Sequence, residues 1–392
     1  MTRVGRDFFE IQSLAIFIAS SGNATHAIMR LEMKDDGLIL AAWAEAVRQN
    51  SPAILATVVK VSGSAYRSPG ARMLLTEAGI RTGSISGGCL ESDVLKKAWW
   101  ITGDRPAALR VYDNSSDEEA IWEFGLGCNG IVHVLLERWS AGARPLTVDL
   151  LQDCSTGPGG GVLASIISGD RVGQKLAIFP DGTLRTEISG HQIVLHAREV
   201  FESGESAVIE IDGQEVFLEY VAPPLPLLIV GAGQDALPLV RFAKELGWQV
   251  TVVDGHSNQA RPERFPSADR VLVCDPVHPL RGLTVNRNTC AVIMSHSYPQ
   301  DEAFVKALLP KPIRYLGVLG PRKRTDRMLA GLEAPAHLHS PVGLDIGADS
   351  PEEIALSVVS EIQAALTGRE GGMLLHRPGP IHSRPLQSEN VA

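Results

Sequence analysis

The sequence predicts a two-domain α/β protein, in which a mixed α+β domain is followed by a Rossmann-like domain built on a parallel sheet. Three observations predict this order. Residues 37–222 mix helical segments with short β runs and turns. The prolines Pro223, Pro224 and Pro226 then mark a boundary. In residues 223–367, apolar strands alternate with helical segments, which is typical of a doubly wound parallel sheet.

The two ends of the chain are expected to lie outside these domains. Residues 1–36 are predicted to be a poorly ordered extension, because Met33 directly precedes the first strongly amphipathic segment. The mildly apolar stretch at 11–19 lacks a strong basic n-region, so no secretion signal is predicted. Residues 368–392 are rich in Gly, Pro, Arg and His and are predicted to be a disordered tail.

Composition and charge exclude several classes of partner. The net charge is −9, and no stripe of Lys and Arg with interleaved aromatics is present, which argues against nucleic acid and acidic membranes. No apolar run approaches the roughly 20 residues that a bilayer span needs. The five cysteines form no C-x-x-C pair, which argues against a disulfide framework and a structural zinc site. We therefore expect a cytoplasmic protein with reduced thiols.

Hydrophobic periodicity and turn residues predict the elements of the first domain. They are a helix at 38–49, strands at 53–61 and 73–76, a helix at 90–101, and strands at 109–112 and 131–137. Residues 155–161 form a glycine-rich break. Residues 162–221 alternate short β runs with turns such as Asp212-Gly213, so a mostly antiparallel sheet is predicted there.

The second domain is predicted as a series of βα units that ends in a capped helix. The predicted strands are 227–230, 249–253, 270–273, 291–294 and 315–318. The last helix begins with Ser350 as its N-cap, Pro351 at the first helical position and Glu353 at the third.

A glycine loop at 231–236 follows the first of these strands and opens a helix. Gly231 allows the tight turn, Gly233 lets a pyrophosphate approach the backbone, and the small Ala236 lets the helix pack on the sheet. Asp254 ends the second strand, where an acid binds a ribose diol and favours NAD over NADP. The alternative is a Rossmann fold that keeps the turn and binds no nucleotide.

Further candidates lie after later strands of this domain. Gly320 and Arg322 follow the fifth strand and begin a basic helix, where they are placed to hold a phosphate or carboxylate. A solvated helix start explains the same residues equally well. His296 follows the fourth strand and is the best candidate for the acid–base group of a hydride-transfer enzyme. Lone loop histidines are more often structural, so we do not predict catalysis by it.

Two glycine–cysteine loops stand out in the first domain. Gly87-Gly88-Cys89 opens a predicted helix, and Gly127-Cys128 lies in a second glycine-rich loop. Free N–H groups at a helix N-terminus lower the pKa of a thiol, and thiolates suit metal contact and sulfur transfer. The alternative for each cysteine is a small buried hydrophobe.

Another loop, which carries two arginines, precedes the two glycine–cysteine loops in the sequence. Gly63 and Ser64 are followed by Arg67 and Arg72, which flank a Ser-Pro-Gly turn. Two arginines around such turns are suited to clamp a phosphate or another oxyanion. A position on the solvated surface is the alternative for both.

These loops carry a resemblance to the XdhC/CoxI family. The segments at 58–73, 83–91 and 125–130 resemble the family's first, second and third motifs, in that order. Two positions depart from the family's pattern. Tyr66 stands where the family often has proline, and Ser86 where it often has glycine.

The second half of the chain resembles the family's Rossmann domain. The resemblance rests on the glycine loop, on 315–320, on 341–348 and on the helix that begins at Pro351. In all, the resemblance spans residues 37–367. Several separate motifs in the right order make it specific.

The resemblance implies an accessory protein for xanthine dehydrogenase and related molybdenum hydroxylases. Such a protein is expected to bind molybdenum cofactor (molybdopterin), to protect it while a terminal oxo ligand is exchanged for sulfido, and to pass it to the apo-hydroxylase. A cysteine desulfurase is the expected source of sulfur. This is the role of a maturation chaperone rather than an enzyme, with a part in sulfur transfer left open. A homodimer is also left open.

The resemblance also implies roles for individual residues. Cys89 and Cys128 are expected to act as the reactive thiols and as transient contacts of the molybdenum. The residues expected around the cofactor are Gly63, Ser64, Arg67, Arg72, Gly87, Gly88 and Gly127. Two other functions remain open, namely an NAD-dependent oxidoreductase and a scaffold that binds desulfurase and hydroxylase without holding a ligand.

Overall fold

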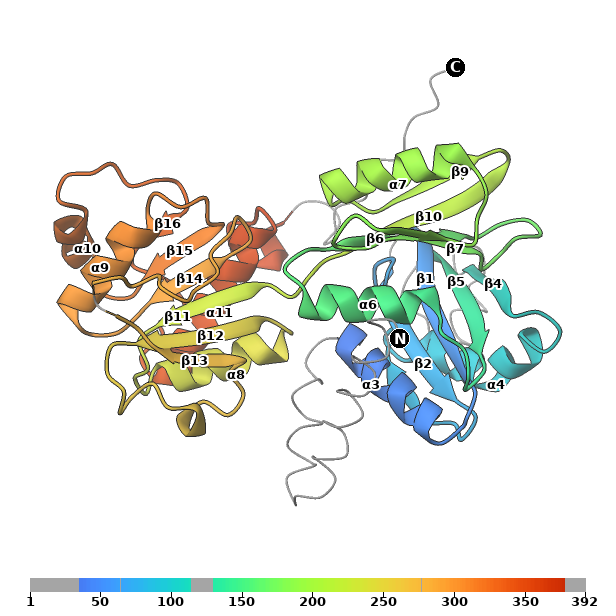
Figure 1. Ribbon diagram of the computed structural model, residues 1–392, viewed down its shortest axis with the longest axis horizontal. Helices are drawn as coiled ribbons and strands as arrows, with labels where there is room; N and C mark the ends of the chain where they lie inside the picture. Colours follow the sequence, from blue (N-terminus) through green and yellow to red (C-terminus); the bar gives the residue numbers. More distant parts are fainter. Residues whose placement is uncertain (1–34, 64, 114–129, 276, 378–392) are drawn as a thin grey trace, which may run out of the picture. The chain divides into compact units, whose positions relative to one another are not determined.

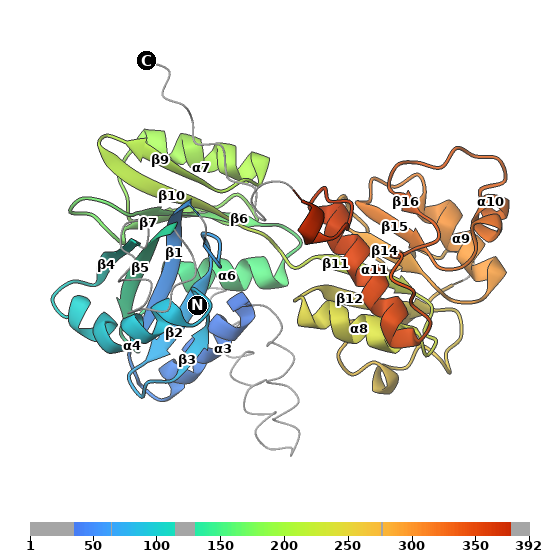
Figure 2. The same cartoon turned by 180° about the vertical axis from the view of Figure 1, so that it is seen from behind.

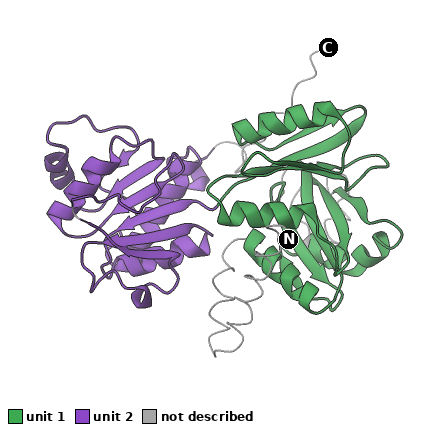
Figure 3. Cartoon of the chain, viewed as in Figure 1, with its two compact units in different colours: residues 1–223, 382–392 green, residues 224–381 purple. Residues whose placement is uncertain are grey.

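The computed structural model describes residues 35–63, 65–113, 130–275 and 277–377 (Figure 1). These residues form two compact units that divide between Pro223 and Pro224 (Figure 3). Unit 1 precedes this division and unit 2 follows it. None of the helices in the described ranges is long and apolar enough to cross a membrane.

Unit 1 contains two antiparallel five-stranded sheets. Sheet A has the order β3-β2-β1-β5-β4 and sheet B the order β8-β7-β6-β10-β9. The strands of sheet A are β1 (Ala53–Gly63), β2 (Arg72–Thr76), β3 (Arg81–Gly83), β4 (Ala107–Asp113) and β5 (Gly130–Trp139). Those of sheet B are β6 (Gly161–Ile166), β7 (Lys175–Ile178), β8 (Leu184–Thr186), β9 (Ala207–Ile211) and β10 (Gln214–Val221).

Within the described ranges, four helices pack on these sheets: α3 (Asp35–Arg48), α4 (Cys89–Ile101), α6 (Leu146–Thr156) and α7 (His191–Ser203). Helix α4 covers one face of sheet A through Val94 and Ala98, and α7 covers the outer face of sheet B (Figure 1). On the remaining faces, α3 packs on sheet A and α6 on sheet B, and Val59, Leu135 and Phe217 pack between the two sheets. The prediction of a mixed α+β domain is therefore confirmed.

Several details of unit 1 differ from the sequence predictions, since neither strand β3 nor helix α6 was predicted. Helix α3 begins at Asp35, inside the stretch predicted to be an extension. Helix α6 runs to Thr156, into the predicted glycine-rich break. Helix α7 lies where only β runs were predicted, and it buries Ile193, Ala197 and Val200 against sheet B. These three side chains recur every three to four residues, which places them on one helical face.

Unit 2 is built on sheet C, a six-stranded parallel sheet with the order β13-β12-β11-β14-β15-β16. Its strands are β11 (Pro226–Val230), β12 (Gln249–Asp254), β13 (Arg270–Val273), β14 (Cys290–Ile293), β15 (Tyr315–Val318) and β16 (Leu338–His339). The predicted strands β11 to β15 are confirmed to within one residue at each end. The two-residue β16 was not predicted.

Four helices cover the two faces of sheet C: α8 (Ala236–Glu245), α9 (Tyr298–Leu308), α10 (Arg322–Leu329) and α11 (Pro351–Leu366). Helices α8 and α11 pack on one face, as Figure 2 shows, and α9 and α10 pack on the other. Ser350 caps α11 by accepting a hydrogen bond from the backbone N–H of Glu353, as predicted. This is a Rossmann-type fold, and its strand order reverses between β11 and β14.

Two short 3-10 helices complete unit 2, at Pro262–Arg264 and Leu374–His376. The second lies in the segment predicted to be a disordered tail. The rest of that prediction falls on residues 378–392, outside the described ranges.

Candidate functional site

The first motif segment of unit 1 lies beside described residues of both other motif segments. Strand β1 ends at Gly63, which pairs directly with Gly130, the first residue of β5. Strands β1 and β3 both run antiparallel to β2, so the chain leaves Gly63 and Gly83 in the same direction. Gly130, the last residue of the third motif, therefore lies beside the end of β1, where the loop of the first motif begins.

A side-chain contact joins the first and second motifs. A Cβ atom built on Gly87 would lie 3.6 Å from Cγ of Tyr66, so the Tyr66 ring lies against this glycine. Tyr66 is 68% exposed. Gly88 has a φ of 117°, in the left-handed region that favours glycine, and α4 begins directly after it. The loop thus presents bare backbone beside an exposed aromatic ring.

The buried carboxylate of Glu91, in the first turn of α4, organises the second loop. It accepts hydrogen bonds from the hydroxyl of Ser84 at 2.8 Å and from the backbone N–H groups of Ile85, Ser86 and Gly88 at 3.1, 2.8 and 3.1 Å. The Ser86 hydroxyl also donates to it. Burial alone would raise the pKa of Glu91, but the hydrogen bonds outweigh burial, so this pKa lies below its ordinary value.

The sequence motifs alone did not reveal this role of Glu91. The available signal is an acid three residues after the glycine that precedes the helix. A side chain at that position can reach back to free N–H groups before the helix.

The two arginines of the first motif have different environments. Arg67 pairs with Asp35 of α3, and both side chains are partly exposed. Arg72 is only 2% exposed, and its guanidinium pairs with Asp36 at 3.0 Å and with Glu219 of β10. Two carboxylates therefore neutralise Arg72 inside unit 1. Arg72 is therefore not available to an oxyanion, which contradicts its predicted role, whereas Arg67 stays partly exposed.

Several predicted site residues lie outside the described ranges. These are Ser64, Gly127 and Cys128. Cys89 is the first residue of α4, which agrees with the predicted helix start, but its side chain is also outside the description. Among the side chains that the structure describes, no three from His, Cys, Asp and Glu are grouped to hold a metal ion. The predicted molybdenum contacts of Cys89 and Cys128 therefore remain predictions.

The second candidate region lies at the carboxyl end of sheet C, around the glycine loop. Gly231 has a φ of 116°, and a Cβ atom there would lie 2.6 Å from Cα of Ser295. Glycine is therefore required where this loop passes the end of β14. Ala236 is buried and opens α8, as predicted. Gly320, with a φ of 114°, and the exposed Arg322 lie after β15 at the start of α10.

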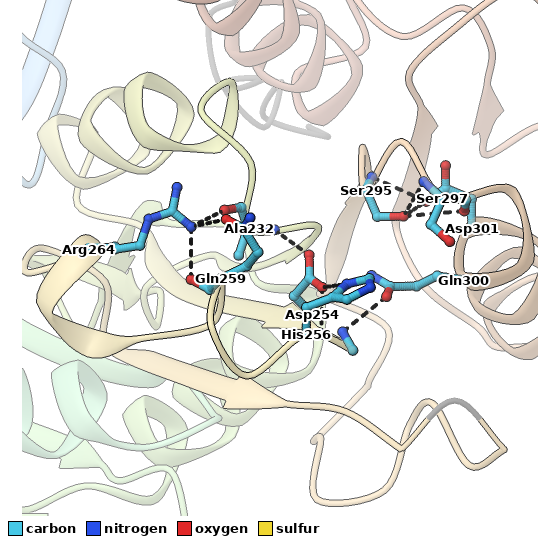
Figure 4. Close-up of polar contacts among 10 residues, drawn as sticks. Ala232, Asp254, His256, Gln259, Arg264, Ser295, Ser297, Gln300 and Asp301 are labelled. Atoms are coloured by element: carbon cyan, nitrogen blue, oxygen red, sulfur yellow. Dashed lines mark hydrogen bonds and ion pairs between the residues drawn. The ribbon is translucent and has the colours of Figure 1, made fainter.

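Asp254 ends β12 as predicted, but its carboxylate holds the protein's own loops (Figure 4). One oxygen accepts a hydrogen bond from the backbone N–H of Ala232 at 2.8 Å. The other lies 2.9 Å from both the backbone nitrogen and the ring Nδ1 of His256. Arg264 fixes the same loop by donating to the Ala232 carbonyl at 2.7 Å.

The loop after β14 is supported in a similar way (Figure 4). The fully buried Asp301 accepts a hydrogen bond from the Ser295 hydroxyl at 2.5 Å and pairs with Arg324 of α10 at 2.6 Å. His296 is the next residue of this loop after Ser295. Its ring Nε2 lies 2.9 Å from the carboxylate of Asp235. In the sequence this histidine stands alone, whereas the structure gives it a carboxylate partner.

Comparisons with known proteins agree with this division of the chain. Residues 46–113 match the model of the XdhC and CoxI family, and residues 227–362 match that of the XdhC Rossmann domain. A protein of Bacillus subtilis (strain 168), named as a probable subunit of xanthine dehydrogenase, is 34% identical over 79% of this chain and 92% of its own length. Escherichia coli (strain K12) has the molybdenum cofactor insertion chaperone PaoD, which is 23% identical over 86% of this chain and 90% of its own length.

A solved structure has the same fold. The crystal structure of a xanthine dehydrogenase from Bacillus halodurans is 32% identical in sequence and superposes with a TM-score of 0.74. The superposition covers 88% of this chain and 98% of that chain. Together with the B. subtilis relative, this match shows that the chain belongs to the XdhC and CoxI family.

Proposed function

We propose that this chain is an accessory protein for a molybdenum hydroxylase of the xanthine dehydrogenase type, and that it binds molybdenum cofactor as cargo. The observation that supports the proposal is that the first motif lies beside residues of both other motifs, through the pairing of Gly63 with Gly130 and the contact of Tyr66 with Gly87. The names of the B. subtilis and E. coli relatives support the same cargo and the same kind of client.

The described residues of these motifs suit a flat, anionic guest. Gly87 and Gly88 are exposed and let a bulky ligand approach the backbone. The open face of Tyr66 offers a surface on which a planar pterin can stack. Arg67 offers a guanidinium to the phosphate of the cargo, in exchange for its partly exposed partner Asp35.

The two thiols complete the proposal. Cys89 and Cys128 contact the molybdenum or carry sulfur for it, and Cys89 is the first residue of α4, where the positive end of the helix dipole favours thiolate. The partners are a cysteine desulfurase, which supplies sulfur, and the apo-hydroxylase, which receives the cofactor. The chain then acts as a maturation chaperone and not as an oxidoreductase.

The thiol roles are tested by activation of the client. Protein loaded with cofactor is mixed with apo-hydroxylase, and the rate of substrate oxidation is followed. We expect Cys89→Ala and Cys128→Ala each to lower the activation at least tenfold, a change of about 1.4 kcal/mol in free energy. The matched control is Cys274→Ala, which removes a buried thiol of unit 2 and is expected to leave activation unchanged.

The outcomes separate the parts of the proposal. Full activation by both cysteine variants, with their molybdenum retained, would show that the thiols have no role. Wild-type protein that binds both the desulfurase and the hydroxylase without any molybdenum would favour a scaffold instead.

A further inference from the structure

A Rossmann fold implies a dinucleotide at the point where the strand order reverses, here between β11 and β14. In that arrangement the pyrophosphate lies on the glycine loop before the helix, and an acid at the end of the second strand binds the ribose. Unit 2 has the loop and the acid, so its residues can be tested for their fit to this ligand.

The first misfit is a side-chain hydrogen bond across the place where a dinucleotide would lie. Asp235 is the last residue of the glycine loop before α8, and its carboxylate lies 2.9 Å from Nε2 of His296. His296 follows β14, so the pair joins the two loops that would form the walls of a nucleotide crevice. A dinucleotide lying between these loops has to break the pair. It also has to bring its two phosphate charges close to the Asp235 carboxylate.

The His296 side of this bridge is held firmly in place. His296 has a φ of 60°, which few residues other than glycine adopt. Its loop is held by the buried Asp301, which accepts hydrogen bonds from both the backbone N–H and the hydroxyl of Ser295. The ring of His296 lies beside Gly233, with Cδ2 3.9 Å from where a Cβ atom would be. The imidazole therefore lies beside the glycine that a pyrophosphate would touch.

The second misfit concerns the ribose. Asp254 is only 4% exposed, and its two oxygens already accept hydrogen bonds from Ala232 and His256. The N–H of Ala232 is one of the loop donors available to an anion, and Asp254 takes it. A ribose diol would have to displace these internal bonds, so the acid predicted to bind it is a support of the glycine loop instead.

From these two observations we infer that the crevice of unit 2 excludes dinucleotides, and that Asp235 is the residue that excludes them. Gly231, Gly233 and Ala236 then serve the turn and its packing rather than a pyrophosphate. The inference is independent of the cargo proposed for unit 1. It makes NAD-dependent hydride transfer at His296 inconsistent with this crevice.

The test is a gain of binding. Equilibrium dialysis of the full chain against NAD⁺ is expected to show no saturable binding by the wild type up to about 1 mM. Asp235→Ala removes both the charge and the bridge, and it is expected to bind NAD⁺ at least tenfold more tightly than the wild type, a gain of about 1.4 kcal/mol. Asp235→Asn removes the charge alone and is expected to show a smaller gain.

A carboxylate outside the glycine loop provides the control. Glu245→Ala removes an exposed carboxylate at the other end of α8 and is expected to bind no better than wild type. Micromolar binding of NAD⁺ by the wild type would overturn the inference. So would a failure of both Asp235 variants to bind when their thermal unfolding shows them to be folded. Misfolding cannot imitate the expected result, because it does not create a saturable site.

Discussion

Arg72→Met is expected to destabilise the protein by about 3–5 kcal/mol, because it leaves a buried carboxylate without its partner. Arg72 pairs with Glu219 of sheet B and with Asp36 of α3, and Glu219 is itself almost fully buried. Urea unfolding at neutral pH measures the loss. The matched control is Arg67→Met, which breaks a partly exposed pair and is expected to cost only about 0–1 kcal/mol.

The loss in Arg72→Met should depend on pH in a definite direction. Burial raises the pKa of Glu219 even though Arg72 lowers it, so removal of Arg72 raises this pKa further. A carboxyl whose pKa is higher in the folded than in the unfolded protein destabilises the folded state as the pH rises above its unfolded pKa. The cost of Arg72→Met should therefore shrink in acid, where Glu219 is protonated.

A second substitution tests the cause. Arg72→Met combined with Glu219→Met is expected to lose less stability than Arg72→Met alone, because no unpaired Glu219 charge remains buried. Equal losses for Arg72→Met and Arg67→Met would contradict the assignment of Arg72 to the interior.

Glu91→Gln is expected to disorganise the glycine–cysteine loop and to lower cofactor retention at least tenfold. The reason is that the substitution removes the negative charge that accepts hydrogen bonds from the hydroxyls of Ser84 and Ser86 and from three backbone N–H groups. Hydrogen bonds to a charged group contribute about 1.5–3 kcal/mol each, so we expect a stability loss of about 2–4 kcal/mol after partial replacement by the amide. Urea unfolding and the molybdenum content of the purified variant measure the two effects.

The pKa of Glu91 is shifted in the opposite direction to that of Glu219, but the cost of Glu91→Gln is also expected to shrink in acid. Because the pKa of Glu91 is lowered in the folded state, its stabilising effect is complete above its unfolded pKa. The effect is lost as the pH falls through the folded pKa, so wild type and Glu91→Gln should converge in acid. Glu77→Gln, an exposed carboxylate in the β2–β3 turn, should match wild type at every pH. A Glu91→Gln protein with wild-type stability and molybdenum content would contradict the role of Glu91.

Local signals were enough to predict most of the fold. The β-branched run of β1 and the alternation of β11 to β15 predicted their strands, and Ser350 with Glu353 predicted the start of α11. Helix α7 was missed although Ile193, Ala197 and Val200 have helical spacing. Its flanking hairpins dominate the local pattern, and Gly190 provides no side-chain cap.

The candidate sites were predictable only in part, because their key contacts join distant residues. The spacing of the glycines predicted the loops, and sheet pairing brought the first and third motifs together. Burial of Arg72 depends on Glu219, 147 residues away, and the bridge across the crevice joins Asp235 to a histidine 61 residues away. Nothing in the sequence around Arg72 or Asp235 indicates these distant partners, so neither contact could be predicted from the sequence pattern.

The claim that the motif segments of unit 1 hold molybdenum cofactor is tested most directly by mass analysis of the ligand released from the full chain, purified from a molybdenum-replete host. The account predicts that molybdenum and its pterin are released together from the wild type. It also predicts that Glu91→Gln retains at most a tenth as much of either. Wild-type protein that carries neither molybdenum nor pterin would contradict the claim.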